Sequence, residues 1–321
     1  MRFTNGKFCD IIKLTFKKEG KNMDISTVLT YLKDLFATVM TLLMMFSPAF
    51  GTTADTYTAE SPDELITSFA VVSDIHVETN HPKAYNNLKG VLEGIELGED
   101  IDSVVYTGDN VMNGQLLEDV LFYSAVKAVM PAENNYVITG NHDLGNGEGD
   151  YDKFRSNFML FNRFVLGNDI DELYYYKVVN GCYMIFMSSE ALCVNDYVIS
   201  DEQMNWLKGV LDEAKEANAP ILVFNHHPIY LVRDRDYREI AWLLQQYDNL
   251  VYFHGHYHNQ LTEGSFYEWH GVDCINVPRA TEYKDYDPGT GLVVEVYEDE
   301  IVVRSRDFIN NVWLDEFRHT Y

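Results

Sequence analysis

The sequence is poor in positive charge. Only 24 of the 321 residues are Lys or Arg, against 50 Asp or Glu, so the formal net charge at pH 7 is −26. Residues 1–51 hold seven basic and four acidic residues, a net +3, which leaves −29 on the remaining 270. A field that negative repels nucleic acid and anionic membranes. The composition therefore argues against a nucleic-acid-binding protein, and a phosphate substrate needs local positive charge to be held.

Cysteine is also scarce. The four residues are Cys9, Cys182, Cys193 and Cys274, and no two of them have the CxxC spacing of a zinc or redox site. In an exported protein Cys182 could pair with Cys193, but buried free thiols are the interpretation we favour. We therefore look for the chemistry of this chain outside its cysteines.

The N-terminal region lacks an apolar run of membrane-spanning length. The uncharged run from Leu35 through Phe46 is shorter than the roughly 20 residues that a spanning helix needs. Basic residues precede it and small residues follow it, which is the order found in a signal peptide. We expect residues 1–54 to form a leader that is cleaved near Gly51 or Ala54, with Met23 as an alternative start, and residues 55–67 to form a linker. The expected location is extracytoplasmic. The alternatives are an uncleaved membrane anchor, which would confine membrane contact to this segment, and an amphipathic helix docked on the domain.

From residue 68 to the C-terminus, at residue 321, we expect one domain of alternating strands and helices. Strand patterns at 68–74, 103–107 and 136–139 alternate with helical patterns at 85–97 and 116–130. This βαβαβ order predicts parallel strands with right-handed crossovers. Further strands are expected at 173–179, 182–188, 221–225, 250–253, 274–277, 291–297 and 301–305, and further helices at 201–218 and 237–247.

Two further signals refine the fold class. Asn180-Gly181 stands between two strand patterns and predicts a two-residue hairpin turn, so an antiparallel pair begins there. Ser200 and Gln203 form a capping box at the start of a helix. Residues 144–167 show no clean period and are read either as a lid or as an ordinary surface excursion. Together the patterns predict an α/β protein of two mixed sheets packed face to face, with helices outside.

Five of the ten expected strands end in residues that bind metals or transfer protons. Seven of the ten histidines fall at these strand ends, and scattered core histidines would not cluster in this way. One strand end, Asn141-His142-Asp143, offers a metal ligand, an acid/base and an orienting group at successive positions: an amide oxygen, an imidazole and a carboxylate. The strand ends are Asp74-Ile75-His76, Gly108-Asp109-Asn110, Gly140-Asn141-His142-Asp143, His226-His227-Pro228 and His254-Gly255-His256-Tyr257-His258.

The donor set contains Asp, Asn and His but no thiolate. Such a set suits divalent or trivalent ions such as Mn, Fe, Zn or Ni and hydrolytic chemistry. In Asp-x-His and His-x-His, two ligands share one face if the backbone there is extended. There are more ligands than one tetrahedral ion uses, whereas two ions that share a carboxylate would use them all.

These five motifs, in this order and at this spacing, resemble those of the calcineurin-like metallophosphoesterases from about residue 68 to residue 258. The resemblance implies a four-layer αββα sandwich with a dinuclear metal centre. Carried over residue by residue, it implies that Asp109 bridges the two metals. The first metal would also bind Asp74, His76 and His258, and the second would also bind Asn141, His226 and His256.

The resemblance also implies a phosphoesterase in which a hydroxide bridging the metals attacks the phosphorus. His142 would protonate the leaving oxygen or stabilise its charge. Many relatives have an Asp three residues after the bridging one, which pairs with the catalytic His, and purple acid phosphatases have a Tyr ligand there. Met112 occupies that position here, so the partner of His142 is not identified and a purple iron centre is disfavoured.

The substrate is the least specified part of the hypothesis. We favour a phosphodiesterase acting on small or nucleotide diesters. The alternatives are a phosphomonoesterase of the same fold and a surface binding protein that keeps its metals but has little turnover. Arg279 and Tyr283 are the candidate substrate contacts, because an Arg fork fits a pair of phosphate oxygens. Arg233 and Arg235 are further candidates, although an exposed Arg beside an acid is more often a surface pair.

Overall fold

The computed structural model describes residues 56–129, 131–282 and 287–321. Contacts divide the chain into two units, residues 1–53 and 54–321, and every described residue belongs to the second. The expected leader therefore lies outside the described residues. Within them, no helix combines the length and the apolarity that crossing a membrane requires.

The first sheet joins strands from both ends of the described chain. Its order is β12-β11-β10-β1-β2-β3, and β13 also pairs with β11. β1, β2 and β3 are parallel, whereas β1 pairs antiparallel with β10, with Phe69 opposite Val294. The strands are β1 Thr67–Val72, β2 Ser103–Tyr106, β3 Asn135–Val137, β10 Thr290–Val296, β11 Ile301–Asp307, β12 Val312–Trp313 and β13 His319–Thr320.

The second sheet has the order β4-β5-β6-β7-β9-β8. β4 and β5 form the hairpin that Asn180-Gly181 predicted, with Val179 opposite Cys182. β5, β6, β7 and β9 are parallel, and β8 closes the edge antiparallel to β9. The strands are β4 Tyr175–Val179, β5 Cys182–Phe186, β6 Ile221–Phe224, β7 Leu250–His254, β8 Phe266–Trp269 and β9 Val272–Asn276.

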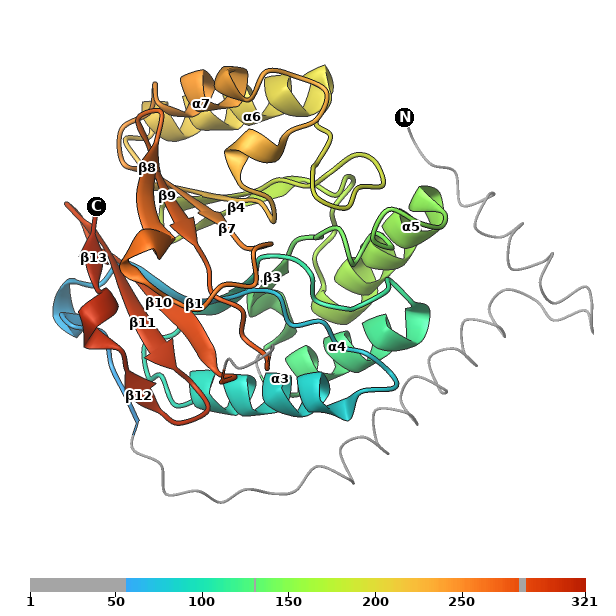
Figure 1. Cartoon of the computed structure of the whole chain (residues 1–321). Helices are drawn as coiled ribbons and strands as arrows, with labels where there is room; N and C mark the ends of the chain where they lie inside the picture. Colours follow the sequence, from blue (N-terminus) through green and yellow to red (C-terminus); the bar gives the residue numbers. More distant parts are fainter. Residues whose placement is uncertain (1–55, 130, 283–286) are drawn as a thin grey trace, which may run out of the picture. The chain divides into compact units, whose positions relative to one another are not determined.

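Helices cover the outer faces of both sheets (Figure 1). α3 and α4 lie below the first sheet in that view, and α6 and α7 lie above the second. Ser200 caps α6 by accepting the amide of Gln203, which is one half of the predicted capping box. The other half does not form, because the amide of Ser200 donates to Glu190 and the side chain of Gln203 pairs with the backbone of Ser188. The helices are α3 Pro82–Ile95, α4 Leu116–Val129, α5 Tyr151–Phe161, α6 Asp201–Glu216 and α7 Tyr237–Leu244. The short helical turns are η2 Pro62–Glu64, η3 Ala132–Asn134, η4 Asn162–Leu166, η5 Ile229–Leu231, η6 Glu263–Ser265 and η7 Asp315–Phe317.

The two sheets pack face to face through aromatic residues. Phe69 of β1 meets Phe224 of β6 edge to face, with ring centroids 6.2 Å apart. Tyr136 of β3 lies 5.5 Å from Phe186 of β5. The opposite face of the second sheet buries apolar side chains against α6 and α7. Helix, sheet, sheet and helix form the four layers of the predicted αββα sandwich.

Three local expectations need correction. The unpatterned stretch 144–167 contains α5, which Asp150 caps by accepting the amides of Asp152 and Lys153. The short strand β8 was not expected. The expected linker 55–67 is packed on the domain from Thr56 onward. Tyr57 is only 7% exposed, and its amide donates to the carbonyl of Leu97.

The cysteines agree with the interpretation of the sequence, since Cys182, Cys193 and Cys274 are buried free thiols. The segment after Ile309 pairs with β11 through β12 and β13. β12 and β13 extend the first sheet on the side away from β3. They therefore do not add to the edge of the sheet formed by β3.

Candidate metal centre

The predicted ligands lie in five loops, each at the carboxyl end of a strand. β1, β2 and β3 are parallel to one another, and so are β6 and β7, so their carboxyl ends meet at one edge of each sheet. Contacts between the loops of the two sheets, described below, bring these edges together. The loop after β1 carries Asp74 and His76, that after β2 Asp109, that after β3 Asn141 and His142, that after β6 His226, and that after β7 His256 and His258.

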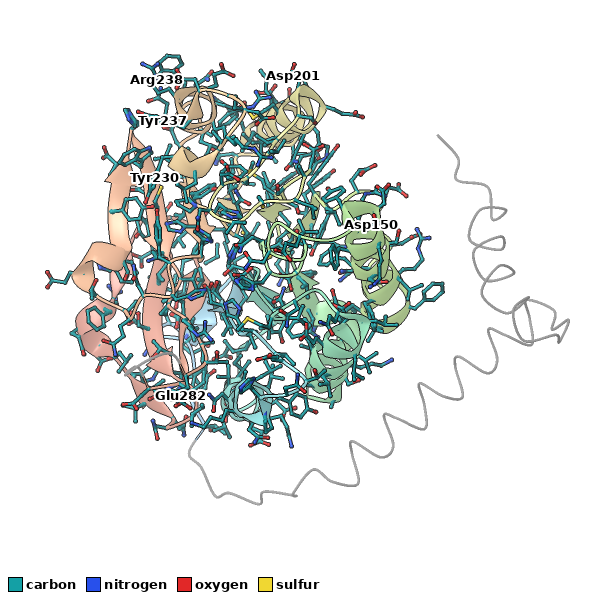
Figure 2. The ribbon with its side chains drawn as sticks, turned by 45° about the vertical axis from the view of Figure 1, so that its right-hand side comes forward. Asp150, Asp201, Tyr230, Tyr237, Arg238 and Glu282 are labelled. Carbon is teal, nitrogen blue, oxygen red and sulfur yellow. The ribbon has the colours of Figure 1, made fainter. Side chains whose placement is uncertain are left out.

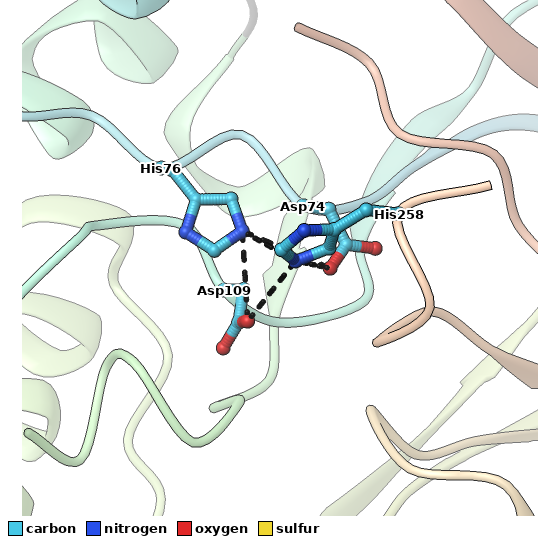
Figure 3. Close-up of side chains that lie close together, drawn as sticks. All are labelled: Asp74, His76, Asp109 and His258. Carbon is cyan, nitrogen blue, oxygen red and sulfur yellow. Dashed lines mark hydrogen bonds and ion pairs between the residues drawn. The ribbon is translucent and has the colours of Figure 1, made fainter. Parts of the chain in front are cut away.

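Four of the predicted ligands form one compact cluster (Figure 3). Asp74, His76, Asp109 and His258 each offer a ligand atom, and these atoms all lie within 4.8 Å of one another. His258 Nε2 is 3.2 Å from Asp74 Oδ1, and His76 Nε2 is 3.6 Å from Asp109 Oδ2. The cluster has the residues and spacing to hold one metal ion.

Of the other three predicted ligands, His226 lies against Asp109, and His256 lies against Asn141. His226 Nε2 is 3.2 Å from Asp109 Oδ2, and its Nδ1–H donates to the carbonyl of Thr107. His256 Nδ1 is 3.1 Å from the Asn141 side-chain oxygen. Asp109 Oδ2 thus faces imidazoles from both groups. The ring of the neighbouring His227 packs against Tyr197 and His256, with centroids 5.6 and 4.5 Å away, whereas it is His226 that contacts Asp109.

The donor atoms fit a cation. Asp74 Oδ1, Asp109 Oδ2 and His226 Nε2 are buried and make no hydrogen bond within the described part of the chain. A buried charged oxygen without a partner is costly, and a bound cation satisfies it. The set of carboxylate, amide and imidazole donors suits Mn, Fe, Zn or Ni. The residues therefore fit the metal site that the sequence predicted.

The carboxylates and two of the imidazoles favour the form that binds a metal, whereas the other two imidazoles must lose a proton to do so. Burial would raise the pKa of Asp74, but His258 and His76 outweigh it and hold that pKa well below its usual range. Burial would likewise raise the pKa of Asp109, and the charge of His226 lowers it instead. Burial lowers the pKa of His76 to about 4 and that of His256 to about 4, so both imidazoles are neutral ligands at pH 7. Burial would lower the pKa of His226 and of His258, but Asp109 and Asp74 outweigh it, raising the pKa of His226 to about 9 and that of His258 above its usual value.

The backbone at these loops is not extended, contrary to our reasoning from side-chain alternation. Asp74, His76, Asp109, His256 and His258 all have φ between 51° and 76°. That left-handed region is uncommon for residues other than glycine, and such residues gather at functional sites. Asp74 and His76 do come together, with His76 Nε2 3.9 Å from Asp74 Oδ1, but residues with left-handed φ place them and not the pleat of a strand.

Two glycines allow the loops to approach. A Cβ atom on Gly140 would lie 2.2 Å from Asp109 Oδ1, and one on Gly255 would lie 2.0 Å from Ser73 Oγ. Both distances are far below a van der Waals contact. These positions require glycine because neighbouring ligand loops pass directly over them.

His142 lies beside the metal ligands. Its backbone amide donates to Asp109 Oδ1 over 2.9 Å, and its ring packs edge to face on His76 with centroids 4.6 Å apart. Its Nδ1 is 2.7 Å from the carbonyl oxygen of Met112. The partner that the sequence could not identify is therefore the backbone of the very residue that replaces the expected carboxylate.

Asp143 acts as the orienting group that the motif suggested. Its carboxylate accepts the amides of Gly140, Asn110 and Val111, over 2.7, 3.1 and 3.1 Å. These bonds tie the loop that carries His142 to the loop that carries Asp109. Asp143 thus positions both.

The sequence did not reveal the residues that hold Asp74. Ser73 Oγ donates to Asp74 Oδ2 over 2.7 Å. Thr281 Oγ1 donates to the carbonyl of Ile75 over 2.9 Å. Ser73 is adjacent to a ligand, but nothing in the sequence brings Thr281 across more than 200 positions.

Of the candidate substrate contacts, Arg279 reaches the site. It is partly buried, and its Nη1 is 3.4 Å from Nδ1 of His258. Tyr283 lies outside the described residues. Arg233 pairs with Asp196, and Arg235 pairs with Asp201 and Glu239, so both are the surface pairs that we weighed against a substrate role.

Comparisons with known proteins identify the family and a similar fold. A model of the calcineurin-like phosphoesterase family matches residues 67–260, which include every candidate metal ligand. The fold is similar to that of a dimetal phosphatase from Danio rerio, with 15% identity and a TM-score of 0.58 over 80% of this chain and 98% of that chain. A predicted phosphoesterase from Streptococcus pneumoniae matches with 13% identity and a TM-score of 0.35 over 79% and 97%. No curated protein matches the sequence significantly.

Proposed function

Because the chain belongs to the calcineurin-like phosphoesterase family, we propose that this metallophosphoesterase hydrolyses small phosphodiesters, nucleotide diesters included, at a centre of two metal ions. The observation that carries the proposal is the place of Asp109. Its Oδ2 lies 3.2 Å from His226, 3.6 Å from His76 and 3.9 Å from His258, and these residues come from different loops. A carboxylate so placed is suited to be shared between two ions about 3.5 to 4 Å apart.

The residues divide into two ligand sets around that carboxylate. Asp74, His76 and His258 would complete one site, and Asn141, His226 and His256 the other. When bound, such a pair of ions neutralises the phosphoryl oxygens and activates water as a nucleophile near neutral pH.

His142 is suited to act on the leaving oxygen. Because its Nδ1–H donates to the carbonyl of Met112, the remaining ring nitrogen, Nε2, is the atom that carries the transferable proton in the imidazolium form. The amide of the same residue donates to Asp109, which fixes the ring relative to the ligands. General acid catalysis from such a position is typically worth about 10² to 10⁴ in rate.

The charge of the protein favours diesters over monoesters. A monoester is largely a dianion near neutral pH, whereas a diester carries one negative charge. The residues from position 52 onward carry a net charge of −29, so they repel an approaching dianion more strongly than a monoanion. Arg279, beside His258, provides local positive charge that suits a single anionic phosphate.

The test is hydrolysis of bis(4-nitrophenyl) phosphate beside 4-nitrophenyl phosphate by the full chain, stripped of metal and reloaded with Mn or Zn. We expect metal-dependent turnover with a higher kcat/KM for the diester. A preference for the monoester would identify the phosphomonoesterase. Tight binding of two metals without turnover of either ester would contradict an enzyme of this substrate class and support the binding-protein alternative.

We further propose export of the protein, on the strength of the leader pattern in residues 1–54. Mass spectrometry of the native protein's N-terminus, after separation of cytoplasm from extracytoplasmic material, tests this. An N-terminus near Gly51 or Ala54 in the extracytoplasmic material supports export with cleavage. Intact chain in the cytoplasm contradicts it.

A further inference from the structure

Two of the ligand loops also carry exposed aromatic side chains. Tyr257 stands between the proposed ligands His256 and His258, and Tyr230 follows the loop of His226. The hydroxyl of Tyr257 donates to that of Tyr230 over 3.0 Å, which links the two loops. Tyr257 is 39% exposed, although its ring centroid lies only 5.7 Å from that of His256.

The aromatic surface continues outward from Tyr230. The ring centroid of Tyr230 lies 4.7 Å from that of Trp269 on β8. The ring centroid of Trp269 lies 6.1 Å from that of Tyr237 at the start of α7. Figure 2 shows Tyr230 and Tyr237 one after the other in the direction of Arg238 on α7. We call Tyr257, Tyr230, Trp269 and Tyr237 the aromatic row.

Two residues of the aromatic row are held by packing, whereas Tyr257 is exposed. Trp269 packs against the apolar core beneath α6 and α7, and Tyr230 is partly buried. These contacts fix the row in place. Tyr257, nearest the metal ligands, keeps the largest exposed fraction of the four and is the ring available to a bound molecule.

The net charge of the protein limits the kind of substrate group that the aromatic row can bind. In a protein with a net charge of −26, a second anionic group on the substrate would be repelled. A planar base is uncharged, and it stacks on a tyrosine without any charged partner. Stacking of one base on an aromatic side chain typically changes affinity by about tenfold or more.

We propose that the aromatic row, with Tyr257 as its principal contact, binds the planar base of a nucleotide diester while the phosphate lies at the metal ligands and Arg279. The inference rests on the proposed function and specifies its substrate class. Tyr257 is assigned a role in specificity and not in the chemical step.

The test compares two diesters with the same leaving group, thymidine 5′-(4-nitrophenyl phosphate) and methyl 4-nitrophenyl phosphate, on metal-loaded full chain. We expect the wild type to prefer the thymidine ester by about tenfold in kcat/KM. Tyr257→Ala should raise KM for the thymidine ester and bring the preference close to one. Tyr257→Phe, which keeps the ring, should retain most of the preference.

Trp242→Ala is the matched control, because Trp242 is also an exposed aromatic residue, 51% exposed on α7, and packs on Arg238. It should leave the preference unchanged. Metal content and thermal unfolding, measured for every variant, show that the folded centre is intact. If both esters are cleaved equally, or if Tyr257→Ala changes both in proportion, the row does not bind the base, although the proposed function stands. Failure of the wild type on both esters would overturn the proposed function and this inference with it.

Discussion

His142 donates a hydrogen bond from Nδ1 to the backbone carbonyl of Met112, 2.7 Å away. In the family pattern a carboxylate often pairs with this histidine, and the side chain at this position here is apolar. A carbonyl fixes the tautomer and the orientation of the ring, but it brings no full negative charge to stabilise the imidazolium. The chain therefore retains the positioning of His142 through a backbone carbonyl in place of a carboxylate.

Replacement of His142 by Ala should lower kcat about 10² to 10⁴-fold while metal content stays close to that of the wild type. The reason is that the ring lies beside the ligands without belonging to either set. Steady-state kinetics with the chromogenic diester, beside metal analysis of the same sample, measure both quantities. Activity within a few fold of the wild type would refute the role of His142.

The carbonyl contact makes a separate prediction about Met112. Met112→Ala removes the side chain and keeps the carbonyl, so it should reduce kcat by less than tenfold. Met112→Asp places a carboxylate where many relatives have one. Because that carboxylate favours protonated His142, the basic limb of the pH–rate profile should move to higher pH. A loss in Met112→Ala as large as in His142→Ala would show that the side chain matters more than the carbonyl.

Asp109 should be the ligand on which both metals depend. We expect Asp109→Ala to abolish binding of both ions, because Oδ2 lies 3.2 Å from His226 of one proposed ligand set and 3.6 Å from His76 of the other. His256→Ala should remove only the second ion and leave about one per chain. Metal-to-protein ratios after gel filtration distinguish the two variants, with Asp152→Asn on the exposed surface of α5 as control. Equal ratios in the two variants would contradict a shared carboxylate.

The glycine at position 140 should be essential to the centre. The added Cβ of Gly140→Ala would meet Asp109 Oδ1 at 2.2 Å and the Asp109 backbone nitrogen at 2.5 Å. Overpacking of this kind typically costs about 1 to 3 kcal/mol, and here it displaces a metal ligand. We therefore expect lower thermal stability and loss of metal together.

Gly209 supplies the matched control. It lies within α6, and a Cβ there meets nothing within 4 Å. Gly209→Ala should stabilise the protein by up to about 1 kcal/mol, because alanine is the better helix former. Chemical denaturation of the two variants measures the contrast, and equal effects would show that crowding at Gly140 is not the cause.

The sequence was sufficient to predict the two-sheet fold and to name the candidate ligands, for a physical reason. Strands such as β1 and β6 are fully buried and read as apolar runs, and α6 carries its own capping signal. Metal-binding residue types at the ends of such strands are visible without coordinates. α5 was missed because the glycine-rich segment before Asp150 obscured the start of its periodic pattern.

The local geometry of the loops could not be read in the same way. Residue type says little about a left-handed φ at a histidine, so the turns at His76 and His258 appeared as extended backbone. Long-range contacts were equally hidden. Thr281 precedes β10, and it reaches the loop of Asp74 because β10 pairs with β1.

Arg279 should serve the phosphate and not the chemical step. Its Nη1 lies 3.4 Å from His258 Nδ1, at the border of the first ligand set, so its guanidinium is in position to meet a phosphoryl oxygen. We expect Arg279→Ala to raise KM for the diester about tenfold with a smaller change in kcat, and Arg279→Lys to recover part of the loss as a point charge without the fork. Arg233→Ala removes an exposed arginine that pairs with Asp196, and it should change neither constant by more than about twofold.

Because Arg279 also contacts a proposed metal ligand, metal content must be measured in each variant. A fall in metal content that accounts for the whole loss would assign Arg279 to holding His258 in place, whereas full metal content with a raised KM places its guanidinium on the substrate.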